Sequence, residues 1–279
     1  MEIPSRLAAI RERIEDACRR AGRPPSAVTL VAVSKAHTVE EVVSAVEAGI
    51  TDLGENRVQE AEAKAASVAS RLGSKGSRPR WHLVGHLQRN KVKKAVALFD
   101  RIHSLESVEL GERVDRAAEE TGKVEPVLVQ VDLALEPTKF GLPEKELFPS
   151  LERLALLKHL SVDGLMVLPP YLADPEAVRP YFRRLSELGA EARGRGLAGS
   201  ELSMGMSHDF EVAIEEGATF IRVGTALFGP RERSERHGDL VKNSNGPGGP
   251  VLPERSPQPP RSAQARSGKP SAEEARGID

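Results

Sequence analysis

The amino-acid sequence predicts an α/β fold: a single (β/α)8 barrel of the TIM type, preceded by a helix and followed by a disordered tail. Short β-branched runs alternate with segments of helical periodicity, and such alternation requires parallel strands joined by right-handed crossovers. Eight strand candidates lie between residues 28 and 224, close to the lower length limit of about 200 residues for such a barrel. The alternative is an open, doubly wound sheet, because short strands are easily miscounted.

The first predicted element is a helix over residues 5–21, which precedes the barrel. Ser5 is placed to cap its N-terminus, and Gly22 is placed to end it. Four apolar side chains recur at helical spacing along one face: Leu7, Ile10, Ile14 and Cys18.

The regular βα alternation begins with the run VTLVAVS at residues 28–34, which is typical of a strand buried on both faces. Thr38 and Glu41 have the spacing of a capping box, and the helix that they open is expected to run to Gly49. The other strands are predicted at residues 52–55, 81–85, 101–104, 126–133, 162–168, 201–205 and 219–224. The helices between them are predicted at residues 58–71, 90–99, 108–120, 144–159, 176–193 and 209–216.

The composition changes abruptly after Pro230. Residues 231–279 are rich in Pro, Gly, Ser and charged side chains and contain few apolar residues. Such a segment buries too little apolar surface to offset the entropy lost on ordering, so a disordered tail is expected. Residues 1–230 are left as the barrel domain.

Composition and charge exclude several classes of protein. The 279 residues are 39% hydrophobic and 29% charged, with a formal net charge of -1. A nucleic-acid binder usually has a strong basic excess, and a spanning helix needs about 18 consecutive apolar residues, which the sequence lacks. The first residues resemble neither a secretory signal nor a transit peptide. Cys18 is the single cysteine, so no intrachain disulfide or cysteine metal cluster is expected. We therefore expect a cytoplasmic protein that handles a small molecule.

In a barrel of this type the functional residues lie where the strands end, at the carboxyl side. Lys35 directly follows the first strand. A lysine amine is a nucleophile when desolvation or a nearby cation lowers its pKa, and it can then form a Schiff base with an aldehyde or ketone. The competing interpretation is a strand-end lysine that extends to solvent.

Two Gly-hydroxyl turns follow the last two predicted strands. SMGMS contains Ser203, Gly205 and Ser207, and the next turn contains Gly224 and Thr225. Glycine lets the backbone approach an anion, and hydroxyls at a helix N-terminus can donate to phosphate. Barrel enzymes often bind phosphate between these two loops. Ordinary helix capping explains either turn alone, but it explains the pair less well.

Other polar residues near the strand ends are less specific. Asn56 could donate to a ligand oxygen or cap the second helix of the barrel, and a buried Arg222 would need an acceptor such as a phosphate or a ring nitrogen. Trp81, His82 and His86 could line the mouth or serve structural roles. Their spacing does not resemble a zinc site, and no metal is expected.

A lysine that forms a Schiff base, placed across the mouth from a phosphate cup, implies a ligand with both an aldehyde and a phosphate. Pyridoxal 5'-phosphate (PLP) fits this description. A phosphorylated sugar bound by an aldolase fits it as well, so the residues alone leave the two open.

Eight stretches, in the same order along the sequence, resemble the pyridoxal phosphate homeostasis proteins, a family similar in fold to the N-terminal barrel of alanine racemase. The resemblance covers about residues 28–230. The stretches are VAVSK at 31–35, GENRVQE at 54–60, WHLVGHLQRNK at 81–91, IHSLES at 102–107, KFGL at 139–142, GLMVL at 164–168, LSMGMS at 202–207 and IRVGTALFG at 221–229.

The resemblance implies that PLP is held as an internal aldimine on Lys35. It also implies phosphate contacts at Ser203, Gly205, Gly224 and Thr225, with Asn56 and Arg222 as further pocket residues. The function implied is vitamin B6 homeostasis, with apo-PLP enzymes as possible acceptors. One departure is His208, which stands where many members carry an acidic residue.

The main alternative is a PLP-dependent racemase of the alanine racemase type. Racemisation needs acid/base groups on both faces of the cofactor, and in such racemases the second group comes from a β-rich domain of the partner subunit. The segment after residue 230 has no strand pattern, and both tyrosines, Tyr171 and Tyr181, lie around the sixth βα unit. We therefore expect a PLP carrier without dedicated catalysis, for which a monomer is plausible.

Overall fold

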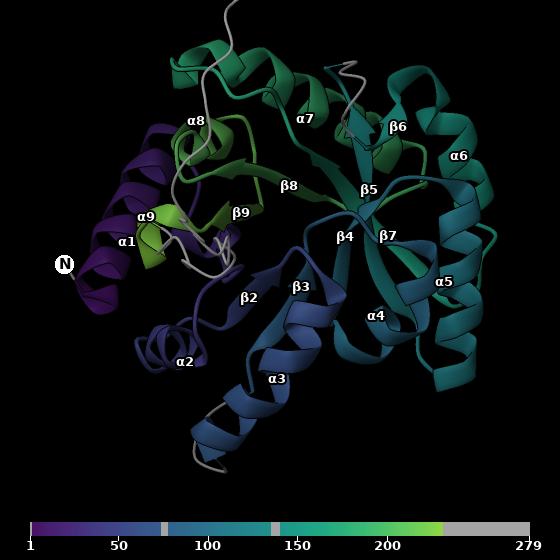
Figure 1. Ribbon diagram of the computed structural model, residues 1–279. Helices are drawn as coiled ribbons and strands as arrows, with labels where there is room; N and C mark the ends of the chain where they lie inside the picture. The colour runs from purple at the N-terminus through teal and green to yellow at the C-terminus, as the bar shows by residue number, and fades with distance from the viewer. Residues whose placement is uncertain (1, 74–77, 135–139, 231–279) are drawn as a thin grey trace, which may run out of the picture. The chain divides into compact units, whose positions relative to one another are not determined.

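The computed structural model describes residues 2–73, 78–134 and 140–230, and the tail predicted for residues 231–279 lies outside this part of the chain. Within it, nine parallel strands form one sheet, and eight of them close into a barrel because β4 also pairs with β5 (Figure 1). The ninth, β6 (Leu142–Pro143), is attached to β5 outside the ring. The ring follows the order β1 (Thr29–Val33), β2 (Asp52–Glu55), β3 (Arg80–Leu83), β4 (Arg101–Leu105), β5 (Glu125–Asp132), β7 (Leu160–Val167), β8 (Glu201–Met206) and β9 (Phe220–Val223). The predicted (β/α)8 barrel is confirmed.

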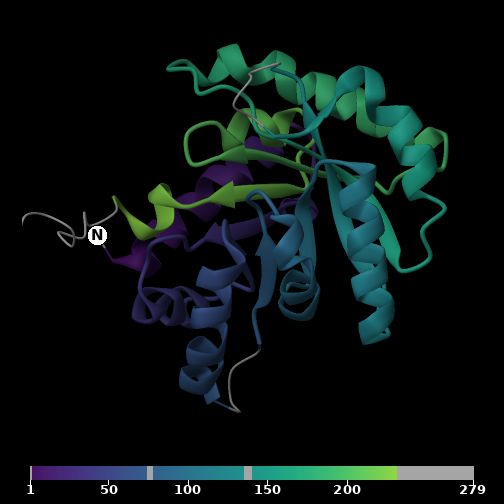
Figure 2. The ribbon, with the colours of Figure 1, turned by 45° about the vertical axis from the view of Figure 1, so that its right-hand side comes forward.

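Helices surround the barrel, and most lie close to the ranges expected from the sequence (Figures 1 and 2). The helix predicted over residues 144–159 ends at Leu154, and the short helix at residues 225–228 was not predicted. Three predicted helices begin with a 3-10 turn, at residues 89–91, 144–146 and 175–178, so their α-helical parts start later than expected. The α-helices are α1 (Ile3–Arg20), α2 (Val39–Glu47), α3 (Val58–Leu72), α4 (Val92–Leu98), α5 (Val108–Thr121), α6 (Leu147–Leu154), α7 (Arg179–Gly194), α8 (Phe210–Glu215) and α9 (Thr225–Phe228). None of those described is long and apolar enough to cross a membrane.

The two predicted helix caps have different outcomes. Ser5 as the N-cap of the first helix is wrong: α1 begins at Ile3, and its N-cap Glu2 makes no side-chain capping bond. Pro4 lies in the first turn, where its missing N–H costs nothing, so the helix begins before Ser5. The capping box of α2 is confirmed, because the Thr38 hydroxyl accepts from the Glu41 N–H at 3.2 Å and the Glu41 carboxylate accepts from the Thr38 N–H at 2.7 Å.

The apolar core has two parts, on the two sides of the strands. The larger part lies between the strands and the helices and includes Leu53, Trp81, Ile221 and the inner faces of α1 and α5. The smaller part fills the barrel interior: Val31, Val33, Val84, Leu128, Met166 and Phe220. This interior also contains buried polar side chains, which are described with the site below.

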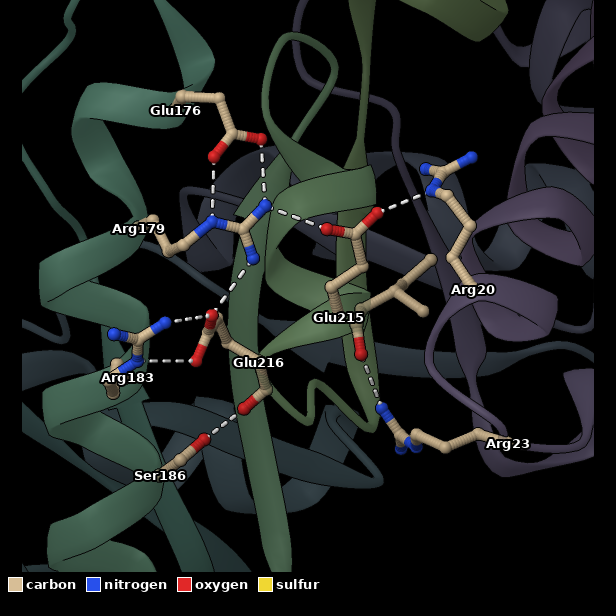
Figure 3. A network of polar contacts seen from close by, with 9 residues as sticks. Arg20, Arg23, Glu176, Arg179, Arg183, Ser186, Glu215 and Glu216 are labelled. Atoms are coloured by element: carbon tan, nitrogen blue, oxygen red, sulfur yellow. Dashed lines mark hydrogen bonds and ion pairs between the residues drawn. The ribbon is translucent and has the colours of Figure 1, made fainter.

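An ion network on the outside of the barrel fixes α8 between α1 and α7 (Figure 3). Arg179 of α7 donates to Glu215 and Glu216 at 2.7 and 2.9 Å, and it also pairs with Glu176. Arg20 of α1 donates to the other oxygen of Glu215 at 2.6 Å. The network therefore holds the short helix that connects β8 with β9, the two strands that lead to the predicted phosphate loops.

Candidate functional site

The carboxyl ends of β1, β8 and β9 meet on one side of the barrel mouth. β9 pairs with β1 on one side and with β8 on the other. Lys35 lies in a turn, two residues after Val33, which ends β1 and packs in the barrel interior. It is partly buried. The structure thus brings the turn containing Lys35 next to the loops that contain Gly205 and Gly224, and not across the mouth from them as expected from the sequence, because β1 pairs directly with β9.

A buried polar cluster on the outer side of β1 braces the turn at Lys35. The Ser34 hydroxyl donates to Oε1 of Glu55 at 2.8 Å. Nζ of Lys64, from α3, donates to the same carboxylate oxygen at 2.8 Å and to the Ser34 carbonyl at 2.6 Å. Ala36, the next residue after Lys35, has φ of 62°, an uncommon conformation for a residue with a Cβ. The backbone at Lys35 is therefore held in a specific turn.

The loops after β8 and β9 are joined by Ser207. Its hydroxyl accepts from the N–H groups of Gly224 and Ala226, both at 3.2 Å. Thr225, which begins α9, is exposed, and Gly224 is partly buried. These two hydrogen bonds therefore join the two Gly-hydroxyl turns predicted from the sequence.

Glycine is required at position 205 for a structural reason that the sequence did not indicate. Its φ is +89°, and an added Cβ would lie 2.6 Å from the Cβ of Ala213 and 2.9 Å from the Cα of Phe210. Both neighbours belong to α8, so glycine permits the close approach of this helix to β8. This requirement is independent of any anion at the site.

Ser203 lies deeper than the helix N-terminus at which it was expected. Its side chain is fully buried, and its hydroxyl accepts from Nη1 of Arg222 at 2.6 Å. Nη2 of Arg222 donates to the Val167 carbonyl at 2.9 Å. Burial lowers the pKa of Arg222 to about 10, although Asp209 opposes the shift. Ser203 and Arg222 are thus brought together beneath the mouth, with a buried cation close to the two loops.

A chain of buried side chains continues from Ser203 through the barrel interior. Nδ1 of His103 lies 2.8 Å from the Ser203 hydroxyl, and Nε2 of His103 lies 2.9 Å from Nδ1 of His82. Nε2 of His82 lies 2.9 Å from Oδ1 of Asp52. Burial lowers the pKa of His103 well below its usual value, and the neighbouring cationic groups lower it further. Burial raises the pKa of Asp52, but hydrogen bonds from His82, Thr51 and Arg80 outweigh it and lower the pKa to about 2.

The sequence argument did not single out Asp52 or His103. The signal that could have found them is strand parity. Each begins or lies within a predicted strand, and each faces the interior when the adjacent strands β2, β3 and β4 are aligned in register. The register pairs Asp52 with Arg80 and His82 with Arg101, so the three side chains share one face and follow a diagonal across the strands.

The residues after β2 and β3 line a second part of the mouth. The backbone of Asn56 packs directly against Gly85, where a Cβ could not fit. A cleft of about 620 Å³ is lined here by residues that include Asn56, Arg57, His86 and Lys91. His86 is exposed and pairs with Glu106 at 2.9 Å. Trp81 does not line the mouth, because it packs in the core between strands and helices.

Two further features bear on the chemistry of the site. In the ranges that the structure describes, no group of three or more His, Cys, Asp or Glu side chains could hold a metal ion. His208 faces the loop after β7, with Nε2 3.2 and 3.1 Å from the carbonyls of Leu172 and Ala173. Asp209, the N-cap residue of α8, makes no side-chain bond to the helix, and its Oδ1 instead accepts from the Met206 N–H at 2.6 Å.

Comparison with known proteins shows the family. The model of the alanine racemase N-terminal domain matches residues 5–232. A protein of Aquifex aeolicus named pyridoxal phosphate homeostasis protein is 42% identical over 233 residues, which are 83% of this chain and 100% of that protein. The chain belongs to the pyridoxal phosphate homeostasis protein family. This finding confirms the resemblance identified in the sequence.

Solved structures support the same assignment. PipY of Synechococcus elongatus, solved with PLP bound, is 40% identical to this chain, with a TM-score of 0.70. The match covers 82% of this chain and 100% of PipY. An alanine racemase of Clostridium difficile has a TM-score of 0.57 at 15% identity, over 78% of this chain and 58% of that one. The racemase shows the shared barrel fold alone.

Proposed function

We propose that this protein binds PLP at the carboxyl end of the barrel and takes part in PLP homeostasis. The observation that carries the proposal is the placement of Lys35 in the turn directly after β1, beside the joined loops after β8 and β9. The names of the relatives and the PLP bound to PipY support it.

The donor set at these loops suits the proposed cofactor. PLP supplies an aldehyde that reacts with amines and a phosphate that needs hydrogen-bond donors. We assign the covalent attachment to Nζ of Lys35. The phosphate is assigned to the loops of Gly205, Gly224 and Thr225, where Thr225, exposed at the start of α9, offers a hydroxyl.

The remaining pocket residues are assigned by their depth. Arg222 is a buried cation that favours an anion or a ring nitrogen close to it. Its guanidinium is held by a hydrogen bond to the buried Ser203 hydroxyl. Asn56, partly buried at the end of β2, is assigned to the wall on the other side of β1 from Arg222. The same fit would serve the phosphate and aldehyde of a sugar, so the ligand must be tested directly.

We further propose a carrier role without dedicated catalysis, with apo-PLP enzymes as acceptors. A racemase places an acid/base group on each face of its cofactor, and such groups typically contribute about 10²–10⁴-fold each. Lys35 accounts for one face. Tyr171 lies on the loop after β7 and is 76% exposed, and Tyr181 lies on α7, so neither is held by the barrel interior.

Two measurements test this function. Titration of the full-length protein with PLP and with pyridoxal should give tight binding of PLP and an absorbance band of bound cofactor. Thr225→Ala should weaken PLP binding by about 10–100-fold, since a hydrogen bond to a charged group contributes about 1.5–3 kcal/mol. Pyridoxal binding should change little. An equal loss for both ligands would contradict the phosphate assignment.

The carrier role is tested by turnover of D- and L-amino acids against a control with free PLP. Exchange of the α-proton with solvent, followed by NMR, should proceed at the rate of the control. A substrate-specific rate above about 1 s⁻¹, the low end for ordinary enzymes, would establish the racemase alternative instead.

A further inference from the structure

A continuous polar chain crosses the barrel interior and ends at the proposed PLP site. It contains Arg222, Ser203, His103, His82 and Asp52, contributed by five different elements: β9, β8, β4, β3 and β2. Successive polar atoms lie between 2.6 and 2.9 Å apart. The five side chains are at most 4% exposed, so water cannot replace a missing partner. Arg80, near the opposite end of the barrel, donates to Asp52 at 2.9 Å.

The donors and acceptors of this chain fit together in one direction. Arginine only donates, so Ser203 must accept from Arg222, and the single hydroxyl hydrogen is then free to point to Nδ1 of His103. His103 donates from Nε2 to Nδ1 of His82, and His82 donates from Nε2 to Asp52. Every ring nitrogen then has one partner, and both imidazoles are neutral.

Adding a proton to either imidazole breaks this arrangement. A doubly protonated His82 would donate to Nε2 of His103, and His103 would then donate from Nδ1 to Ser203. The Ser203 hydroxyl would accept twice and would lose the acceptor for its own hydrogen. A buried donor without a partner is costly, so the chain with neutral rings is favoured. Burial disfavours a second proton on His103, and the nearby cations Arg222 and Arg101 disfavour it as well.

We propose that His82 and His103 are positioning residues that, through the Ser203 hydroxyl, hold Arg222 in the orientation in which it meets the bound cofactor. This role rests on the proposed function, because it is defined by the PLP site. Asp52 anchors the far end of the chain and fixes the tautomer of His82. The two histidines act through Ser203 and do not themselves contact the ligand.

The first test uses the apoprotein and is independent of PLP. Nitrogen-15 NMR of the imidazoles reports which ring nitrogen carries hydrogen, and the chain has seven histidines to assign. We expect hydrogen on Nε2 of both rings and none on Nδ1 of either. Hydrogen on Nδ1 of either ring would overturn the proposed direction.

The second test measures PLP affinity in matched variants of the full-length protein. His103→Leu removes the acceptor for Ser203, whereas His103→Asn keeps an oxygen near the position of Nδ1. We expect His103→Leu to weaken PLP binding by about 10–100-fold, as for a lost hydrogen bond in a charged network. We expect His103→Asn to stay within about threefold of the unaltered protein, the range of near-neutral changes.

Leu128→Ala is the control for a purely structural effect. Leu128 is fully buried in the barrel interior and is apolar, so its truncation destabilises the barrel without removing a hydrogen bond of the polar chain. We expect a lower unfolding midpoint with PLP affinity retained. Equal loss of affinity in His103→Leu and Leu128→Ala, or no rescue by asparagine, would overturn the positioning role. Failure of the unaltered protein to bind PLP would refute the proposed function. The NMR result would still test the direction of the hydrogen bonds in the polar chain.

Discussion

Glu125 makes a specific prediction for how stability depends on pH. It begins β5, at the end of the barrel opposite the proposed site, and it is fully buried. Nζ of Lys123 lies 2.6 Å from Oε2, but in poor alignment, so neither carboxylate oxygen has a hydrogen-bond partner among the described residues. Burial raises the pKa of Glu125 from 4.5 to about 7, Lys123 opposes the shift, and Asp100 adds to it.

The sign and size of the effect follow from this pKa. The folded state binds the proton more tightly than the unfolded state, so stability from this group is present at acid pH and is lost as pH rises toward 7. Each tenfold change in proton affinity corresponds to about 1.4 kcal/mol. Between pH 5 and pH 8 the unaltered protein should therefore lose about 2–3 kcal/mol through Glu125.

Glu125→Gln replaces the carboxyl with a neutral group of the same shape that does not titrate. Relative to the unaltered protein, the free energy of unfolding of this variant should rise by about 2–3 kcal/mol between pH 5 and pH 8. Urea unfolding at both pH values measures the difference, with Glu120→Gln as the control for removing an exposed carboxylate. A difference that is constant between the two pH values, or that falls with pH, would refute the argument.

Three further predictions concern the outer helices, the loop glycine and the tail. Arg179→Met removes the guanidinium shared by three carboxylates, so the free energy of unfolding should fall by about 1–3 kcal/mol in low salt. The fall should be smaller in 1 M salt, because salt screens charges. An equal fall at both salt concentrations would contradict the ion network. Gly205→Ala should lower the melting temperature, because φ is +89° and α8 leaves no room for a Cβ, whereas Gly194→Ala, which meets open space, should not. Removal of residues 237–279 should leave both the melting temperature and PLP binding unchanged, because this stretch has few apolar residues with which to pack; a fall in either would contradict the domain boundary.

The fold could be predicted because the strands carry a strong local signal. β-branched runs such as residues 28–34, buried on both faces, stand out against the polar helices between them. Parallel strands then oblige the turns at Lys35, Gly205 and Gly224 to lie at one end of the barrel. The placement of these three turns follows from chain order alone.

The polar interior could not be predicted in the same way. The partners of Ser203 lie on β4 and β9, and the contact with His103 spans 100 residues of sequence. Such pairs depend on the register between strands, which no local pattern reveals. For the same reason the sequence assigned the Ser203 hydroxyl to the mouth, whereas Arg222 and His103 hold it in the interior. The start of α1 was missed through a local effect, the tolerance of Pro4 in a first helical turn.

The central claim is that Lys35 binds the cofactor covalently, and reductive trapping tests it most directly. The full-length protein is saturated with PLP, treated with borohydride, digested and analysed by mass spectrometry. The proposed function predicts a single reduced adduct on the peptide that contains Lys35, and no adduct at this position in Lys35→Ala. A reduced adduct on another lysine, such as Lys139, with Lys35 unmodified, would contradict the assignment.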